Sequence, residues 1–488
     1  MTITSIQFGV FAAVVIGLYY FLPRRGQNLL LLIASYVFLV SWNWTFAVVY
    51  LLLTGVNYIL APMVGGKKAR GRLALLGGIL LNIGALAFFK YANFFLPSAV
   101  GLLQAIGIRS ELGSLQILLP VGLSFAVVQA ISYLMDAWAG VNKGASGFVD
   151  FALYMAFFPR VIAGPIERAR VFLPQLQQKR TFRTAKISDH LIVFIQGLIR
   201  KMVIADLLFL ILPQQVFQSP LRYSAVELAV WLLAFTFALY NDFAGYSMMA
   251  RGIAGCLGLS LTNNFEVPYF SRNFSELWRR WHISLSMWLR DYIFMPSVRS
   301  LLKMKFSRDH LFSIVIPPML TMLVSALWHG VGVGMFLWGF LHGLFLVIER
   351  VMQLSRPGQP IQKQAVWRQF LSAGGVFVLV ALTWVPFRAD LAPTLQYWGK
   401  LLSPSEWISA LGTPQILQYQ ILNRLTLDVV GLVGLSLILD VIQYRFGELA
   451  VAKLPIPVQA VVINLVFFAL IFASMAQNVP PPFVYQGF

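Results

Sequence analysis

Long apolar stretches, repeated along the whole chain, restrict most strongly what this sequence can fold into. A helix that crosses a bilayer core about 30 Å thick needs roughly 20 mainly apolar residues. Charged residues make up only 11% of the chain and hydrophobic residues 59%, whereas about a quarter of a soluble domain is charged. Apolar runs fall near residues 4–22, 28–43, 45–62, 73–90, 115–135, 148–163, 190–212, 225–246, 311–328, 332–349, 370–386, 426–443 and 457–475.

This pattern predicts an all-α polytopic membrane protein with about 11–13 transmembrane or re-entrant helices. The short alternating segments of a membrane β-barrel are absent from the sequence. No internal repeat, low-complexity tract or linker divides the chain, so residues 1–488 are expected to form one integral membrane domain. The first segment lacks a basic start and a cleavage site, and we interpret it as a retained span.

The net charge of +19 comes from Lys and Arg in short connections between the apolar runs. Such a distribution is typical of the positive-inside bias, and it argues against nucleic acid as a partner. The clusters Arg24-Arg25, Lys67–Arg72 and Arg168–Lys186 are therefore expected on the cytoplasmic side. That placement requires one intervening run, most simply 148–163, not to cross fully. Cys256 is the only cysteine, and no ligand pattern predicts a metal site.

Two stretches interrupt the apolar pattern with prolines or glycines. Residues 157–165 hold two prolines, a glycine and Arg160, and residues 242–259 hold four glycines. Irregular backbone at membrane depth is tolerated only where protein or a wet cavity surrounds it. Both stretches are expected to be either re-entrant pieces that line a cavity or interfacial loops.

Residues 269–292 combine aromatic and charged side chains with helical spacing. At about 100° per residue, Trp281, Leu285 and Trp288 share one face with Tyr292, whereas Arg279, Arg280 and Arg290 lie elsewhere. This pattern predicts an amphipathic interfacial helix, with Ser275 as its N-cap, that is too charged to span. Trp278 and Trp281 beside His282 favour a lined site, but a helix resting on lipid headgroups remains an alternative.

His329 ends the apolar run that starts near residue 311, in the sequence Ser325-Ala326-Leu327-Trp328-His329-Gly330. An ionisable residue inside a span is costly and usually faces the bundle interior, so function is the default hypothesis. A buried histidine with only a structural hydrogen bond is the alternative. His342 lies within another span and shows that an intramembrane histidine alone does not identify a catalyst.

A secondary transporter is a hypothesis from another class. Asp136, Asp206 and Asp242 are ionisable residues within apolar surroundings that such a protein would need. However, the two interrupted stretches do not form an evident internal repeat, and a tryptophan-rich interfacial helix has no obvious role in alternating access. A transporter or polysaccharide flippase therefore remains the less favoured interpretation.

The run Trp278-Arg279-Arg280-Trp281-His282 followed by Leu327-Trp328-His329-Gly330 closely resembles the membrane-bound O-acyltransferase family. The similarity is to its bacterial branch, which includes the alginate O-acetylation and teichoic-acid D-alanylation membrane proteins. Further similar segments occur in the same order, so the resemblance covers most of the chain: Asn28–Tyr36, Phe89–Asn93, Leu119–Phe125 and Ala163–Pro165. The chain departs from the alginate-type pattern at Met248 and at Pro296–Ser300.

The resemblance implies a helix bundle with a central funnel in a bacterial cytoplasmic membrane. It implies that the family's two histidines correspond to His282 and His329, and that His329 is the catalytic one. No bound cofactor is implied, since acetyl-CoA or an acyl carrier thioester would be the donor substrate, and an extracytoplasmic acetyltransferase or polysaccharide would take the acyl group. D-alanyl transfer to a wall polymer is the alternative within the family. The residues expected to bind substrate or line the funnel are Trp328, Ser325, Trp278, Arg279, Arg280, Trp281, Asn241 and Asp242.

Overall fold

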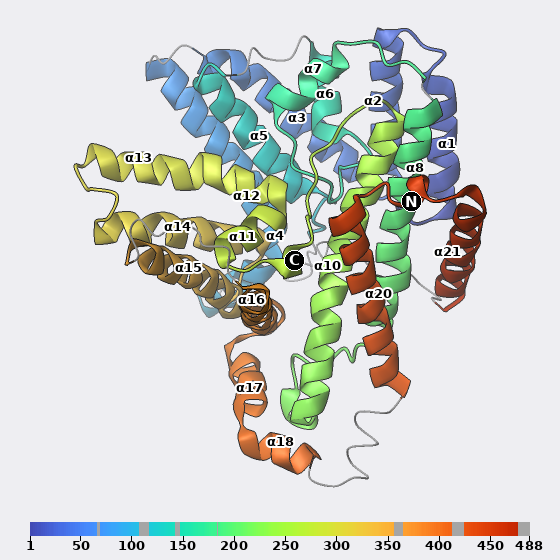
Figure 1. The fold of residues 1–488 in the computed structure, drawn as a ribbon. Coiled ribbons are helices and arrows are strands. Elements are labelled where there is room, and N and C mark those ends of the chain that lie inside the picture. The colour runs from blue at the N-terminus through green and yellow to red at the C-terminus, as the bar shows by residue number, and fades with distance from the viewer. Residues whose placement is uncertain are drawn as a thin grey trace. The chain divides into compact units, whose positions relative to one another are not determined.

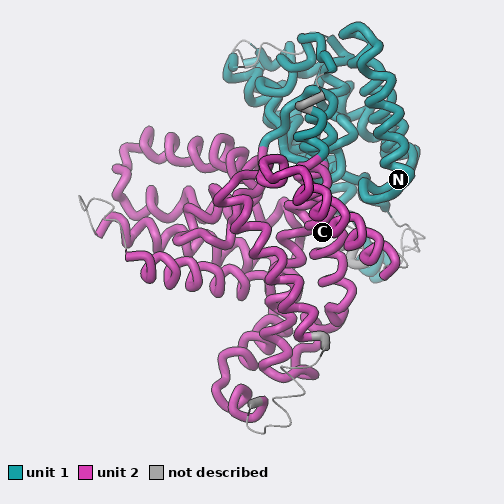
Figure 2. Tube along the Cα trace, turned by 45° about the vertical axis from the view of Figure 1, so that its right-hand side comes forward, with its two compact units in different colours: residues 1–191, 250–262 teal, residues 192–249, 263–488 magenta. Residues whose placement is uncertain are grey.

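A computed structural model describes residues 1–65, 69–106, 117–141, 147–182, 184–355, 365–411 and 424–476 (Figure 1). These residues form two compact units, coloured in Figure 2. Unit 1 consists of residues 1–191 and 250–262, and unit 2 consists of residues 192–249 and 263–488. The chain enters unit 2, returns to unit 1 and enters unit 2 again, and the expectation of one domain stays a prediction.

The described residues contain helices and no strand, which confirms the all-α prediction. Eight of their helices are long and apolar enough to cross a membrane, and two shorter apolar helices cover Ile6–Tyr19 and Leu123–Trp138. The eight lie at Trp44–Val64, Ala69–Asn93, Ala225–Cys256, Leu311–His329, Val333–Leu354, Val366–Arg388, Thr426–Phe446 and Ile456–Ala476. The protein is therefore a multi-pass membrane protein.

Unit 1 is built from nine helices or parts of helices among its described residues: α1 (Ile6–Tyr19), α2 (Arg24–Val40), α3 (Trp44–Val64), α4 (Ala69–Ala105), α5 (Leu123–Trp138), α6 (Phe148–Ala156), α7 (Ala169–Leu176), the start of α8 (Thr184–Leu198) and the end of α10 (Ala225–Cys256). Asn57 of α3 and Asn82 of α4, both fully buried, exchange two amide hydrogen bonds of 2.8 and 3.1 Å. Such side-chain bonds join helices in a membrane, where apolar contact alone gives no preference for protein over lipid.

The first irregular stretch lies inside unit 1. The 148–163 run gives only the nine-residue helix α6, and the chain then continues without a regular helix to Arg168. Residues 151–169 are buried throughout. Protein therefore surrounds this irregular backbone, and the run does not form a full span. Its assignment as a re-entrant piece or an interfacial loop stays a prediction.

Unit 2 carries the second half of α8, the long helix α10 (Ala225–Cys256) up to residue 249, and all later helices. Its remaining elements are η2 (Ile199–Ala205), α9 (Asp206–Ile211), η3 (Pro220–Arg222), η4 (Pro268–Phe270), α11 (Phe274–Arg280), α12 (Ile283–Leu289), η5 (Arg290–Phe294), α13 (Met295–Lys303), α14 (Leu311–His329), α15 (Val333–Leu354), α16 (Val366–Arg388), α17 (Leu391–Leu402), α18 (Pro404–Leu411), α20 (Arg424–Phe446), η6 (Val451–Lys453) and α21 (Ile456–Ala476). Helices α13, α14 and α15 run side by side in Figures 1 and 2.

The second irregular stretch was predicted wrongly. Residues 242–256 continue α10 as regular helix and form neither a re-entrant piece nor a loop. Its glycines serve close packing, since a Cβ on Gly245 would lie 2.7 Å from the carbonyl oxygen of Gly197 on α8. Small residues let membrane helices approach in this way, and the sequence pattern does not distinguish that use from a break.

The amphipathic segment is also not one continuous helix. It divides into α11 and α12 at Trp281 and His282, where the backbone leaves the helical region. The N–H groups freed by this break donate to Asn264, from Ile283 to its carbonyl at 3.0 Å and from Ser284 to its side chain at 3.2 Å. Ser275 is not the cap, because the Asn273 side chain accepts from the Glu276 N–H at 2.7 Å.

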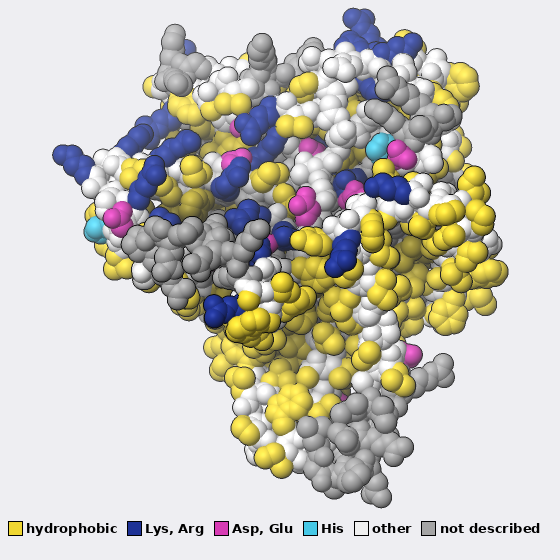
Figure 3. All heavy atoms as spheres, viewed as in Figure 1, with side chains coloured by type: hydrophobic (Ala, Val, Ile, Leu, Met, Phe, Trp, Pro, Cys, Tyr) yellow, Lys and Arg dark blue, Asp and Glu magenta, His cyan; other side chains and the backbone are white. Residues whose placement is uncertain are grey.

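The surface of unit 2 agrees with a membrane protein that has a basic interfacial segment. Figure 3 shows Lys and Arg side chains over α13, where Arg299 and Lys303 are exposed. Over α20 the same view is mainly apolar, and Leu427, Val430 and Ile438 are each more than half exposed there. Exposed apolar side chains on a helix of spanning length are those that lipid solvates.

Candidate active site

The packing of α14 against α15 places His329 within unit 2. Gly339 and Gly343 lie one turn apart on α15 and face α14, where added Cβ atoms would meet Ala326 Cβ at 2.6 Å and Met319 Sδ at 2.7 Å. A small-residue pair at this spacing lets two membrane helices come into backbone contact. The α14 helix ends at His329 because the next residue, Gly330, is fully extended.

His329 is 4% exposed and lies among aromatic rings. Its ring centroid is 4.7 Å from Trp328, 5.4 Å from Trp338 of α15 and 5.5 Å from Phe387 of α16. All three contacts are edge-to-face, a preferred geometry for aromatic pairs. The imidazole thus lies in an apolar setting and is almost fully shielded from solvent.

One face of α15 contacts the segment that forms α11 through four residues spaced four, three and four apart: Trp338, His342, Phe345 and Glu349. Trp338 and His342 both contact Trp278, at 6.0 and 5.2 Å between ring centroids, and Phe345 stacks on Phe274 at 4.4 Å. Residues with this spacing lie on one side of a helix. The contact fixes the interfacial segment that carries His282 against the helix pair that carries His329.

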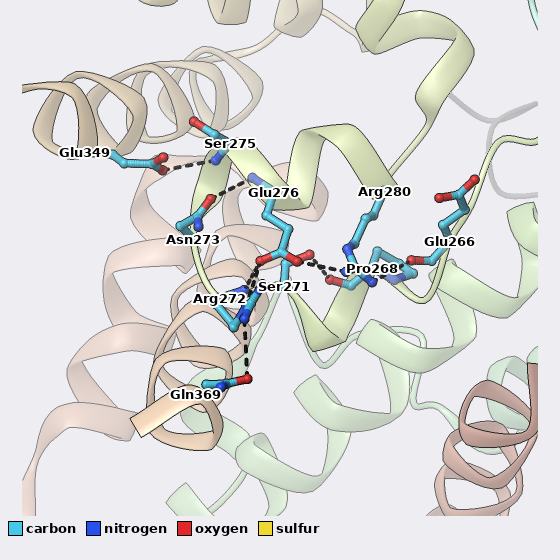
Figure 4. Close-up of polar contacts among 10 residues, drawn as sticks. All are labelled: Glu266, Pro268, Ser271, Arg272, Asn273, Ser275, Glu276, Arg280, Glu349 and Gln369. Carbon is cyan, nitrogen blue, oxygen red and sulfur yellow. Dashed lines mark hydrogen bonds and ion pairs between the residues drawn. The ribbon is translucent and has the colours of Figure 1, made fainter. Parts of the chain in front are cut away.

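Polar contacts fix the start of α11 (Figure 4). The Ser275 N–H donates to Glu349 of α15 at 3.0 Å, and Glu276 pairs with Arg280 at 2.8 Å and with Arg272 at 3.3 Å. Burial raises the pKa of Glu276, but the hydrogen bonds from Arg272 and the two arginine charges outweigh it and lower the pKa below its ordinary value. This carboxylate is therefore ionised and structural.

His282 has a backbone conformation that is unusual for a residue with a side chain. Its φ is 43° and its ψ 52°, the left-handed region that costs about 1–2 kcal/mol for non-glycine residues. Its Nδ1 accepts a hydrogen bond of 3.3 Å from the Leu285 N–H and so caps α12. Burial lowers its pKa to about 3. The ring is therefore neutral, and its single proton is on Nε2.

The two histidines belong to one aromatic cluster. The His282 ring lies 5.9 Å from Trp328, whose ring also contacts His329, and 4.6 Å from Phe243 of α10. The structure thus brings together two residues that are 47 positions apart in the sequence. Their catalytic roles stay predictions.

Three other predicted residues lie beside this cluster. Ser325 is fully buried one turn before His329, and its Oγ has no hydrogen-bond partner in the structure. Trp281 is 3% exposed and lies 5.2 Å from Trp384 of α16. Trp278 is half-buried and contacts His342.

The remaining predicted residues lie in other surroundings. Arg279 is exposed, and the Arg280 guanidinium pairs with Glu276. Asn241 accepts a hydrogen bond of 3.0 Å from Arg200, and Asp242 pairs with Lys201 at 2.8 Å. Both acceptors are fully buried on α10, in a network that joins this helix to η2 and whose arginine also pairs with Asp440 of α20 at 2.6 Å. A role in substrate binding for these four residues stays a prediction.

Several residues of the cluster were not predicted. Trp338, Trp384 and Phe387 bring α15 and α16 to the site, and the His342 Nε2 lies 3.0 Å from Thr383 Oγ1. The spacing of Trp338, His342, Phe345 and Glu349 along one helix face is the signal that points to them in the sequence. Among the described residues no group of three or more His, Cys, Asp or Glu side chains is placed to hold a metal ion.

The fold and this cluster define a multi-pass membrane protein with a buried histidine site. The model of the membrane-bound O-acyltransferase family matches residues 29–382. The chain belongs to this family and is an O-acyltransferase.

Three relatives illustrate the family's range. The chain is 35% identical to the probable alginate O-acetylase AlgI of Pseudomonas putida, over 87% of this chain and 85% of the relative. It is 31% identical to the peptidoglycan O-acetyltransferase of Helicobacter pylori, over 78% of this chain and 76% of the relative. It is 28% identical to the teichoic acid D-alanyltransferase of Streptococcus thermophilus, over 62% and 76%.

Proposed function

We propose that this chain transfers an acetyl group from a cytoplasmic thioester, acetyl-CoA or an acyl carrier, for O-acetylation of an extracytoplasmic polysaccharide. The protein would act in a bacterial cytoplasmic membrane, with a partner acetyltransferase that passes the group to the polymer. The observation that carries the proposal is the placement of His329 and His282 against the same tryptophan, Trp328, within a buried aromatic cluster. Similarity to alginate O-acetylases over most of the chain supports acetyl as the group.

The chemistry assigns different roles to the two histidines. His329 accepts the proton of the attacking hydroxyl as its oxygen bonds to the thioester carbonyl carbon. The tetrahedral intermediate then collapses, the carbon–sulfur bond breaks, and the proton passes from His329 to the leaving thiolate. His282 bears its proton on Nε2, because Nδ1 caps α12. It therefore acts as a hydrogen-bond donor that orients or polarises the acyl thioester.

D-alanyl transfer to a wall polymer is the alternative within the family, and the teichoic acid D-alanyltransferases support it. Their identity of 28% and 26% is lower, and they match a smaller part of this chain than the alginate-type relatives do. Transport without chemistry is the alternative outside the family, and membership of an acyltransferase family argues against it.

Replacement of His329 tests the proposal. His329→Ala is expected to lower acetylation of the exported polymer by about 10²–10⁴-fold, the usual contribution of a general base. The protein should still insert at normal abundance, because a smaller side chain leaves the Gly339 and Gly343 packing intact. His310→Asn is the matched control, since His310 lies exposed at the other end of α14 and its capping bond to Phe312 is one that Asn can make. Near-normal acetylation by His329→Ala at normal abundance would contradict the proposal.

A further inference from the structure

The helix α13 and the turn that follows it form a basic surface on unit 2 (Figure 3). Arg299 and Lys303 lie four residues apart on α13 and so share one side of the helix. Lys305 and Arg308 follow in the turn, and all four residues are exposed. No residue from 292 to 308 is acidic, and none of the four cations forms an ion pair with a described residue. This basic surface therefore carries four positive charges without a carboxylate partner in the described part of the chain.

Apolar side chains are exposed beside these charges. Met295, Leu302 and Met304 are each more than a third exposed. A cation inside the hydrocarbon core of a bilayer is costly, and an apolar side chain is unfavourable in water. A charged helix of nine residues is also too short to span. Only the boundary between the lipid headgroups and the acyl chains suits both kinds of side chain.

Contacts within unit 2 hold the basic surface in place. The buried side chain of Leu301 marks the inner side of α13, which packs against η5 and α14. The N–H groups of Lys305 and Phe306 donate to the carbonyls of Leu302 and Leu301, each at 3.1 Å, and close the helix end. The Phe306 ring then contacts Phe312 at the start of α14, at 5.4 Å between ring centroids. The cations are thus carried by a packed helix and a hydrogen-bonded turn.

We propose that the basic surface binds the headgroups of anionic phospholipids, with the exposed apolar side chains of α13 and its turn among the acyl chains. Such a lipid supplies a phosphate for the cations and hydrocarbon for Met295, Leu302 and Met304. An acidic protein that approached from the aqueous side would match the charges alone. Basic clusters next to spanning helices attract anionic lipid in this way.

The lipid contact bears on the active site through the chain. His282 caps α12, and η5 and α13 follow α12 directly. The helix α14, against which α13 packs, ends at His329. A headgroup-bound α13 therefore anchors the segment between the two histidines at the membrane surface, without touching the reacting atoms.

The test measures the lipid affinity of the full chain in micelles of a non-ionic detergent. Phosphatidylglycerol is the anionic probe, and phosphatidylcholine with the same acyl chains is the zwitterionic comparison. Thermal unfolding is followed as each lipid is added, because a ligand that binds the folded state stabilises it. Arg299→Gln combined with Lys303→Gln is expected to lower the affinity for phosphatidylglycerol about 25-fold, since each cation contributes about fivefold. The affinity for phosphatidylcholine should not change.

Two controls separate a local site from general effects. Arg350→Gln combined with Arg445→Gln removes two exposed positive charges of unit 2 outside the basic surface, and it should leave the affinity for phosphatidylglycerol nearly unchanged. Arg299→Lys combined with Lys303→Arg keeps both charges and should keep the affinity. An equal loss in the Arg350 and Arg445 variant would mean that only net charge matters and would overturn the site.

A second double variant covers the case in which the first does not fold. Lys305→Gln combined with Arg308→Gln leaves α13 unchanged and should lower the affinity for phosphatidylglycerol to a similar extent. Lipid binding is measured without acyl transfer, so the result does not depend on the proposed function. An unchanged affinity for phosphatidylglycerol in both double variants would overturn the proposal. If these variants reduced only transfer from an acyl carrier protein, the surface would be a docking face for that protein, which overturns the lipid assignment as well.

Discussion

Both units bury polar side chains among apolar helices, but they differ in how those side chains are paired. In the irregular stretch of unit 1, both terminal nitrogens of Arg160 donate, to Gln129 and to the Tyr154 carbonyl, and the guanidinium lies over the rings of Tyr154 and Phe172. Glu167 accepts from the backbone and side chain of Thr262. Most of these polar atoms are therefore paired within the protein, although Arg160 Nε has no hydrogen-bond partner in the structure.

The histidine cluster of unit 2 is different. Ser325 Oγ, His342 Nδ1 and the indole nitrogens of Trp338 and Trp384 are buried without hydrogen-bond partners in the structure. A polar group left in this state costs about 1–3 kcal/mol, and a fold that needs it only for stability has no reason to retain it. Single atoms of this kind also occur in unit 1, for example Arg160 Nε and Trp42 Nε1. The comparison teaches that several such atoms gathered around contacting rings, rather than the presence of buried polar residues, set the histidine cluster apart.

The largest effect on stability is expected in unit 1. Gln129→Leu removes the acceptor of one Arg160 nitrogen and leaves a buried cation underbonded, which should cost about 3 kcal/mol. The expected outcome is lower abundance in the membrane and earlier thermal unfolding in detergent. Acetylation per folded molecule should stay normal, because the residue serves only the fold.

Ser325→Ala is the matched substitution in unit 2, because Ser325 is also fully buried. It removes a hydroxyl without a protein partner, so thermal unfolding should be unchanged or slightly later. If Gln129→Leu left abundance normal and Ser325→Ala lowered it, the contrast between the two regions would be wrong.

A smaller effect is expected at His282. Its Nδ1 caps α12, and its Nε2 is the hydrogen-bond donor of the proposed reaction. His282→Ala removes the α12 cap at a cost of about 1 kcal/mol and should also lower acetylation about tenfold, the value of one hydrogen bond. His282→Asn keeps a capping oxygen and tolerates the left-handed backbone. Asparagine should therefore restore thermal stability but not activity. Full activity in both variants would reduce His282 to a structural residue.

The sequence predicts the helical class and the site's two histidines for different reasons. Spanning helices follow from apolar length, and His282 and His329 stand out through the tryptophans beside them. The break at His282 was not predictable, because the freed N–H groups are taken by Asn264, whose proximity arises only in the fold. The same holds for Gly245, whose packing on Gly197 cannot be distinguished from a helix break by sequence.

His342 shows the limit most clearly. Its position within a span is visible in the sequence, but its partner Thr383 lies 41 residues away on another helix, and their contact arises only in the fold. The orientation of the helices across the membrane can likewise be predicted only in part from the sequence. Basic clusters predict a cytoplasmic side, but Lys67 and Lys68 lie outside the described residues, and the orientation of the helices stays a prediction.

The smallest effect is expected at the start of α11, where prediction and structure name different caps. Asn273 accepts from the Glu276 N–H, whereas Ser275 contributes its backbone N–H to Glu349 (Figure 4). Asn273→Ala should therefore destabilise the protein by about 1 kcal/mol, and Ser275→Ala by close to zero. Thermal unfolding in detergent measures both. Activity per folded molecule should be retained in each variant, since the polar groups at this end of α11 are paired with one another, as most of those around Arg160 are. A larger loss for Ser275→Ala than for Asn273→Ala would restore the cap predicted from the sequence.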